Sequence, residues 1–393
     1  MTARILYPGL LHGTVTPPVS KSLLHRILIA RVLAGESLPA PWPGEGEDLA
    51  ATRRCLSVLT EQGGDGLPEM DCGQSASTLR FLLPLALSLR GGGRFKGSPR
   101  LFERPLEPYL ETLGRKGVRF CQDAGSLLAE GRLPAGEYVL PGDVSSQFVT
   151  GLLFALPTVA GESRITLTGR LVSGPYVDLT MEVLCRAGIL VNEKENTFTT
   201  FGKQMFKRFD WDPETDWSQA AFWYAANFLG SCIEIKGLNP KSLQGDRRIT
   251  QWYPMMERPG DLRLDLGQNP DLLPAVALMA AARTGKTCLV NAGRLRNKES
   301  DRIRTSAGLL AALGASVDER EDGLVLNGPC RLQGGVTVNP SGDHRIAMMA
   351  AVAATVCESP VVLTDADCVC KSYPEFWNHY HSLGGKSDVL ISG

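Results

Sequence analysis

The sequence predicts an α/β protein of two domains, and its length, its apolar runs and its short β-like segments are the observations behind this prediction. At 393 residues, the chain is longer than one hydrophobic core usually spans, so we expect two domains. Hydrophobic residues make up 43% and charged residues 21%, a balance typical of a protein with a large buried core.

The helices are predicted from six segments that repeat one plan, in which a few small or polar residues precede a long apolar run. These segments begin at Pro18, Cys72, Gly142, Thr215, Asn269 and Ser341. Ser, Thr and Asp ahead of such runs are typical N-cap residues, and runs that are apolar on nearly every side indicate buried helices. Amphipathic stretches with β-like tails follow most of the runs. Six units of about 65 residues therefore suit two domains of three units each.

Overall charge excludes some classes of partner. Lys plus Arg total 41 and Asp plus Glu total 42, so no net field attracts nucleic acid or an acidic membrane surface. No apolar stretch reaches about 18 residues and no signal peptide is evident, so we expect a cytoplasmic protein. The ten cysteines, such as Cys185, Cys232 and Cys357, lie in apolar surroundings and are expected to be reduced core thiols.

The polar helix starts carry the candidate chemistry. A helix N-terminus has unpaired N–H donors and a partial positive charge, so several such ends directed at one place would bind anions. Hydroxyl, amide and cationic side chains at these starts are Lys21, Ser22, Arg26, Arg104, Ser145, Ser146, Gln147, Ser173, Lys298, Arg302, Arg345 and Lys371. Asp271 and Glu299 lie among them as candidates for proton transfer, although Asp271 by position alone is equally a helix cap.

Cofactors are not expected. The sequence has no Gly-rich phosphate-binding loop and no GxGxxG ahead of a helix, which argues against a nucleotide cofactor. Cysteines and histidines show no metal-ligand spacing, so we expect no metal. The sequence therefore predicts a cationic cleft for small anionic substrates.

The motifs SKSLLHR, CGQSASTLRFL, PRLFERP, GDVSSQF, SGPYVDLT, NPDLLP, LRNKESDRI, DHRIAMM and CKSYP, in this order, resemble the EPSP synthase family of enolpyruvyltransferases. The resemblance spans nearly the whole chain. It implies two domains, each with three βαβαββ units and buried parallel helices, an inside-out α/β barrel. Residues 1–16 plus 214–393 would form one domain and 17–213 the other, with crossover hinges near residues 16 and 213.

The resemblance also implies a reaction, the transfer of the enolpyruvyl group of phosphoenolpyruvate to the 5-hydroxyl of shikimate 3-phosphate in aromatic amino-acid biosynthesis. The expected ligands of shikimate 3-phosphate are Lys21, Ser22, Arg26, Ser145, Ser146, Gln147, Ser173, Asp271 and Lys298, with Tyr176 as a weaker candidate. The expected phosphoenolpyruvate clamp is Lys21, Arg104, Gln147, Arg302, Arg345 and Lys371. Asp271 would take the hydroxyl proton, and Glu299 with Lys21 would protonate the methylene carbon.

Four residues depart from the family pattern, namely Gln74, Ala76, Ser77 and Arg294. Ala76 stands where the family usually has Gly beside the phosphoenolpyruvate pocket, which glyphosate occupies in this family, so we expect reduced glyphosate sensitivity. Arg294 stands where many members have Asn, which leaves that substrate contact open.

Two alternatives remain at this point. One is the related enolpyruvyltransferase that acts on UDP-N-acetylglucosamine, which uses a cysteine on a mobile loop; no cysteine here lies in a loop of that composition. The other is an anion-binding protein without catalysis, against which Lys21, Asp271 and Glu299 argue. The expected partners are the two small substrates, without nucleic acid or membrane. A monomer is expected, because no exposed apolar stripe is evident.

Overall fold

A computed structural model describes residues 2–61 and 66–390. The chain divides into two compact units. Unit 1 comprises Met1–Val19, Pro43–Gly46 and Glu214–Gly393, and unit 2 comprises Ser20–Trp42 and Glu47–Pro213. Each unit is described below by itself.

Unit 2 contains two four-stranded sheets of identical topology. The first has the order β3-β4-β6-β5 and the second β7-β8-β10-β9. In each sheet the first two strands are parallel and the other neighbours antiparallel. The strands are β3 (Glu69–Asp71), β4 (Gly92–Lys96), β5 (Arg119–Gln122), β6 (Ser126–Glu130), β7 (Gly136–Pro141), β8 (Ser163–Thr168), β9 (Val191–Lys194) and β10 (Thr197–Thr200).

Unit 1 repeats this topology twice, and its second copy is completed by the start of the chain. The orders are β12-β13-β15-β14 and β16-β17-β1-β18, so the N-terminal strand β1 lies between β17 and β18. Ile5 of β1 pairs with Val362 on one side and Asp388 on the other, both antiparallel. The strands are β1 (Ala3–Tyr7), β12 (Leu262–Asp265), β13 (Gly285–Val290), β14 (Ser316–Arg320), β15 (Gly323–Gly328), β16 (Thr337–Val338), β17 (Val361–Leu363) and β18 (Lys386–Leu390).

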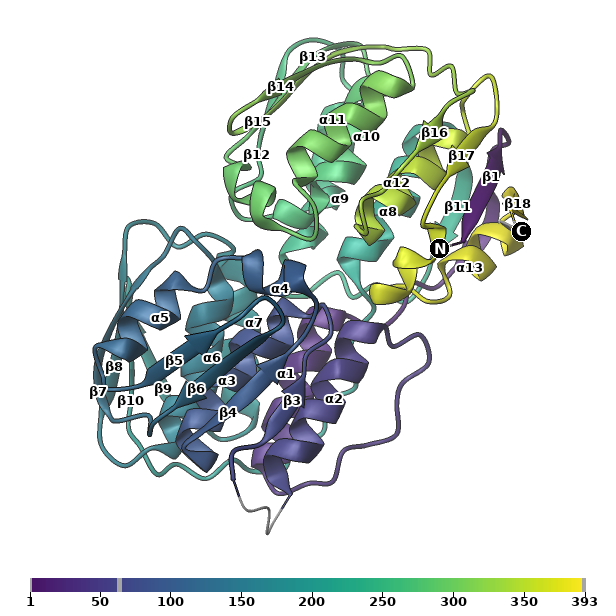
Figure 1. Cartoon of the computed structure of the whole chain (residues 1–393). Helices are drawn as coiled ribbons and strands as arrows, with labels where there is room; N and C mark the ends of the chain where they lie inside the picture. The colour runs from purple at the N-terminus through teal and green to yellow at the C-terminus, as the bar shows by residue number, and fades with distance from the viewer. Residues whose placement is uncertain (1, 62–65, 391–393) are drawn as a thin grey trace. The chain divides into compact units, whose positions relative to one another are not determined.

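The six apolar runs all form buried helices, as predicted. They are α1 (Lys21–Leu33), α3 (Ala76–Arg90), α6 (Ser146–Ala155), α8 (Trp217–Phe228), α10 (Leu273–Ala282) and α12 (His344–Ala354). Every residue of α12 is buried, as expected for a helix that neighbours cover on all sides. Within unit 1, α8, α10 and α12 pack against one another inside the strands (Figure 1). Within unit 2, α3 packs against α6 and α1 against α7.

Shorter or more amphipathic helices cover the remaining faces. They are α2 (Glu47–Thr60), α4 (Pro99–Glu103), α5 (Glu107–Gly114), α7 (Gly174–Arg186), α9 (Ile249–Met256), α11 (Arg302–Ala312) and α13 (Phe376–Ser382). The 3-10 turns are η1 (Leu156–Thr158), η2 (Gly245–Arg248), η3 (Pro270–Leu272), η4 (Gly293–Asn297) and η5 (Ala366–Lys371).

The predicted α/β class and its repeats are confirmed, with one difference in the strands. Among the described residues, four copies of the unit carry a four-stranded sheet. The copy around α8 has only the parallel pair β2 (His12–Val15) and β11 (Cys232–Ile235). Among the described residues, the copy around α1 has the helices α1 and α2 without a sheet of its own. The six units were predicted from their apolar helix runs and not from their strands. The reduced copies were therefore not distinguished from the others.

The structure also bears on the predicted burial of the cysteines and on the predicted lack of a membrane-spanning segment. Cys357 is buried, but Cys185 and Cys232 are exposed, so the core assignment was wrong for these two thiols. An apolar neighbourhood in sequence does not decide which face of a helix or strand a residue occupies. Within residues 2–61 and 66–390, none of the helices has the length and apolar character needed to cross a membrane.

Candidate active site

Unit 1 gathers its predicted site residues around Asp271. The carboxylate accepts a hydrogen bond from Arg302 Nη1 at 2.8 Å and forms an ion pair with Arg345 Nη2 at 3.2 Å. Lys298 Nζ lies 3.7 Å from the same carboxylate. Three cations, two from the segment 298–302 and one from α12, thus converge on one aspartate, which a helix cap alone would not require.

Arg302 is the centre of this cluster. It is 1% exposed, and its Nε donates to Asp343 at 2.9 Å while its Nη2 donates to Glu299 at 2.8 Å. Lys371 Nζ lies 3.8 Å from the other oxygen of Glu299. A planar guanidinium suits this arrangement, because its five donors lie in a fixed fork. The two candidate proton-transfer groups, Asp271 and Glu299, therefore share one buried arginine.

The charges around Asp271 decide its protonation state. Burial by itself would raise the pKa of Asp271, but Arg345, Lys298 and Arg302 outweigh burial and hold that pKa well below its usual value. Burial would likewise lower the pKa of Arg302, yet the charges of Asp343, Glu299 and Asp271 raise it. Asp271 is therefore an ionised carboxylate that its own cations make a weak base. An anion that draws those cations away would make it a stronger one.

Local structure places these side chains at the ends of helices. Asp271 lies in η3, which leads directly into α10, and Arg345 lies in the first turn of α12. Lys298 follows η4, and Arg302 is the first residue of α11. Pro270 suits η3, because its fixed φ matches a helix start and it has no N–H to leave unpaired.

Helix starts are capped more fully than the sequence suggested. In unit 1, Asp216 accepts from the amide of Ser218 at 2.8 Å, and Asp343 accepts from that of Arg345 at 3.0 Å. These anionic caps offset the positive ends of α8 and α12. The expectation that helix ends themselves attract anions is therefore wrong for these two helices. In this unit the positive charge lies on the cationic side chains Lys298, Arg302, Arg345 and Lys371 rather than on these two helix ends.

In unit 2 the caps on the buried helices are neutral hydroxyls. Ser20, Ser75 and Ser145 accept from first-turn amides of α1, α3 and α6. A hydroxyl satisfies an amide without adding negative charge, so these helix ends retain their favourable potential for an anion. The anion-binding expectation therefore applies better to unit 2 than to unit 1.

Lys21 and Arg26 both lie on α1 in unit 2 but have different surroundings. Lys21 Nζ donates to Asp48 of α2 at 2.9 Å. Arg26 is 2% exposed and donates to the Thr180 hydroxyl at 2.8 Å and to the Tyr176 carbonyl at 2.8 Å. Within the described residues Arg26 has no carboxylate partner, and burial lowers its pKa to about 9. A buried cation paired only with neutral groups is well suited to an anionic ligand.

Gln147 is held by two neighbours at the start of α6. Its Oε1 accepts from Arg80 at 2.8 Å, and its Nε2 donates to Ser77 at 2.8 Å. Arg80 of α3 thus pairs with the start of α6 inside unit 2. Ser145 and Ser146 directly precede Gln147, as the N-cap and the first residue of α6.

Ser173 and Arg104 complete the predicted set in unit 2. Ser173 adopts a left-handed conformation with φ 55°, although it is not glycine, and its side chain makes no cap hydrogen bond to α7. Such backbone strain is concentrated at functional sites. Arg104 ends α4 and is 7% exposed.

Sequence reasoning missed two partners of the predicted residues. Asp48 pairs with Lys21, but it lies in an acidic stretch with no distinguishing pattern. Asp343 was not among the predicted site residues, yet it is 0% exposed and accepts a hydrogen bond from Arg302. The position before an apolar run was its one available signal. Arg294, the departure from the family pattern, donates to the Gly267 carbonyl at 2.6 Å.

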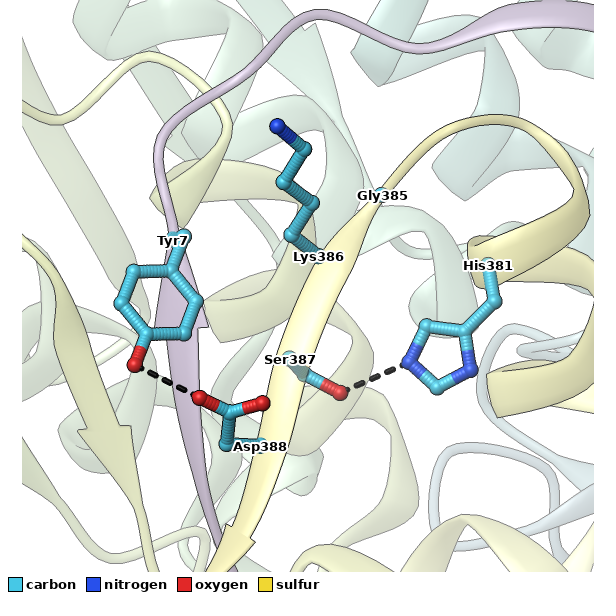
Figure 2. A pocket seen from close by; sticks show the side chains of 6 residues that line it. All are labelled: Tyr7, His381, Gly385, Lys386, Ser387 and Asp388. Atoms are coloured by element: carbon cyan, nitrogen blue, oxygen red, sulfur yellow. Dashed lines mark hydrogen bonds between the residues drawn. The ribbon is translucent and has the colours of Figure 1, made fainter.

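A separate surface pocket lies elsewhere in unit 1 (Figure 2). It is lined by Tyr7, His381, Gly385, Lys386, Ser387 and Asp388, none of which belongs to the predicted site. Tyr7 donates to Asp388 at 2.8 Å, and His381 shares a hydrogen bond with Ser387 at 2.8 Å. These polar groups are thus already paired with one another. Among the described residues, no group of three or more His, Cys, Asp or Glu side chains is arranged to hold a metal ion.

Solved structures define the class of the fold. EPSP synthase from Acinetobacter baumannii superposes with a TM-score of 0.76 over 100% of both chains, at 22% identity. The enolpyruvyl transferase NikO from Streptomyces tendae gives a TM-score of 0.77 at 18% identity, over 100% of this chain and 99% of that one. The fold is therefore that of the enolpyruvyl transferases.

Sequence comparisons identify the family within this class. The model of the EPSP synthase (3-phosphoshikimate 1-carboxyvinyltransferase) family matches residues 7–380. The 3-phosphoshikimate 1-carboxyvinyltransferase of Clostridium kluyveri is 39% identical, and that of Clostridium beijerinckii 37%, each over 98% of both chains. The chain belongs to the EPSP synthase family.

Proposed function

We propose that this chain transfers the enolpyruvyl group of phosphoenolpyruvate to the 5-hydroxyl of shikimate 3-phosphate, with release of phosphate. The observation that carries the proposal is the convergence of Arg302, Arg345 and Lys298 on Asp271 in a full-length member of the family. Cations that surround a half-buried carboxylate suit a site where an anionic substrate must meet a general base.

The chemistry assigns a role to each of the two candidate proton-transfer groups, Glu299 and Asp271. Glu299 gives a proton to the methylene carbon of phosphoenolpyruvate, which leaves a cationic centre at the neighbouring carbon. The 5-hydroxyl attacks that centre and passes its proton to Asp271. The tetrahedral adduct then returns a proton from its methyl group to Glu299 and expels phosphate, which takes up the proton that Asp271 received. Arg302, Arg345 and Lys371 balance the negative charge of phosphoenolpyruvate and of the leaving group.

Binding groups in unit 2 fit the sugar-like substrate. Ser22, Arg26, Ser145, Ser146 and Ser173 offer hydroxyl and guanidinium donors for shikimate 3-phosphate. On the same proposal, Lys298 and Asp271 of unit 1 also contact this substrate, and Lys21 and Gln147 serve both substrates. Arg104 joins the phosphoenolpyruvate clamp.

We also propose that Lys21 assists Glu299 in protonating the methylene carbon. Lys21 is paired with Asp48, so the proposal requires that the substrate compete for this lysine. We propose the two domains as residues 1–16 plus 214–393 and residues 17–213, with hinges near residues 16 and 213.

Phosphate release from phosphoenolpyruvate tests the proposed reaction. The wild-type chain should release phosphate only when shikimate 3-phosphate is present, and Asp271→Ala should bind both substrates yet lose turnover by about a hundredfold or more. A folded wild-type sample that releases no phosphate would refute the reaction. Near-normal turnover by Asp271→Ala would refute the role of Asp271 alone.

We further propose that the enzyme works as a cytoplasmic monomer without a cofactor. The chain exposes a few large apolar side chains, among them Leu190, Phe201 and Met205 in one short region. Light scattering should give a mass of about 42.5 kDa, that of a single chain. A mass of two chains would refute the monomer.

A further inference from the structure

Asp246 is a buried acid of unit 1 that lies outside the predicted site. It belongs to η2 and is 1% exposed. Its carboxylate accepts a hydrogen bond from the Ser218 hydroxyl in the first turn of α8. Helix α8 packs against both η2 and η3, the turn that carries Asp271. The two turns that carry Asp246 and Asp271 thus pack against the same helix.

The first turn of α8 does not need Asp246 as a cap. Asp216 already accepts from the amides of Ser218 and Gln219 at 2.8 and 3.1 Å. The side chain of Gln244 accepts from the Trp217 amide at 3.1 Å. The first-turn amides of Trp217, Ser218 and Gln219 therefore have partners other than Asp246. A second buried carboxyl group is more than helix capping requires.

Charged groups face Asp246 from three elements. Asp271 of η3 and Asp216, the N-cap of α8, repel its ionised form, whereas Arg345 of α12 attracts it. Burial, followed by the charge of Asp271, raises the pKa of Asp246 to about 7, although Arg345 and the Ser218 hydroxyl act in the opposite direction. The Asp246 carboxyl group thus lies in the electrostatic field of both Asp271 and Arg345.

We propose that Asp246 is a positioning residue for enolpyruvyl transfer, which acts by placing a second buried carboxyl group within electrostatic range of the Asp271–Arg345 pair. The inference rests on the proposed function, since it assigns Asp271 as the base. An ionised Asp246 repels an ionised Asp271 and so favours the protonated form that Asp271 adopts when it accepts the hydroxyl proton. A neutral Asp246 exerts no such effect.

The pH dependence of kcat tests this role, with Asp246→Asn as the variant because asparagine keeps the shape and an acceptor for Ser218. For the wild type, kcat should rise about threefold to tenfold between pH 6 and pH 8 as Asp246 ionises. In Asp246→Asn this rise should be absent, while the KM values change by less than about threefold. Superposable pH profiles of the two proteins would overturn the inference.

Thermal unfolding and a second variant separate this role from a structural one. Because ionising Asp246 is unfavourable in the folded state, the Tm of Asp246→Asn at pH 8 should equal or exceed that of the wild type. A purely structural carboxylate predicts a lower Tm at every pH and an unchanged profile of kcat.

Ser218→Ala keeps the carboxyl group and serves if Asp246→Asn does not fold. Loss of the hydroxyl donor should move the rise in kcat to higher pH, and an unmoved rise would overturn the inference. If the wild type releases no phosphate at any pH, the proposed function fails and this inference with it. An active wild type with unaltered profiles in the variants refutes the inference alone.

Discussion

His25 gives unit 2 a specific sensitivity to acid. The side chain is 1% exposed within α1, and its Nδ1 shares a 2.8 Å hydrogen bond with the Thr52 hydroxyl. Thr52 in turn bonds Thr78 at 2.7 Å, so the histidine belongs to a buried chain of polar groups. Its Nε2 has no hydrogen-bond partner among the described residues. A second proton on this ring would therefore be buried without an acceptor.

The size of the effect follows from the pKa of His25. Burial, the largest cause, lowers that pKa from 6.5 to about 3, so the folded state keeps a neutral ring. The stabilisation is fully present above pH 6.5, and it is lost as the pH falls toward 3, because only the unfolded chain then binds the proton. Between pH 7 and pH 5 the loss is about 2 kcal/mol, or about thirtyfold in the unfolding equilibrium.

Hydrogen exchange of the α1 amides measures this loss within unit 2. After correction for intrinsic exchange rates, wild-type protection should fall about thirtyfold more between pH 7 and pH 5 than that of His25→Gln, which cannot be protonated. His12→Gln, at an exposed histidine, is the matched control and should follow the wild type. Equal losses of protection in the wild type and His25→Gln would refute the reasoning.

Four further substitutions test packing and specificity. At Gly46 an added Cβ would lie 2.4 Å from the Lys371 carbonyl oxygen, so Gly46→Ala should displace Lys371 and raise the KM for phosphoenolpyruvate about tenfold. Gly308→Ala, with open space in α11, should leave KM unchanged and raise Tm slightly. Arg283 donates to four backbone carbonyls and one hydroxyl, so Arg283→Lys should lower the free energy of unfolding by about 2 to 4 kcal/mol in urea titrations. Ala76→Gly should increase inhibition by glyphosate, as the family resemblance implies; equal inhibition of both proteins would contradict it.

Several parts of the site could be predicted because they depend on local sequence. Ser75 and Ser145 cap α3 and α6 as their positions before apolar runs predict. Arg302 and Arg345 interrupt helix starts that are otherwise buried, and a buried cation needs a partner. The identity of that partner was not predictable. Glu299 is a local partner, three residues before Arg302, whereas Asp271 and Asp343 reach Arg302 from segments that only the packed helices bring together.

The sequence by itself determined the six buried helices, the repeat, the family and the residue types of the site. These features follow from periodicity, capping chemistry and motif order, which act over a few residues at a time. The tertiary structure decided which charges meet: the pairing of Lys21 with Asp48, the anionic caps on α8 and α12, and the carboxyl group of Asp246. Electrostatic energy depends on distance and burial, and both are set only when segments remote in sequence pack together.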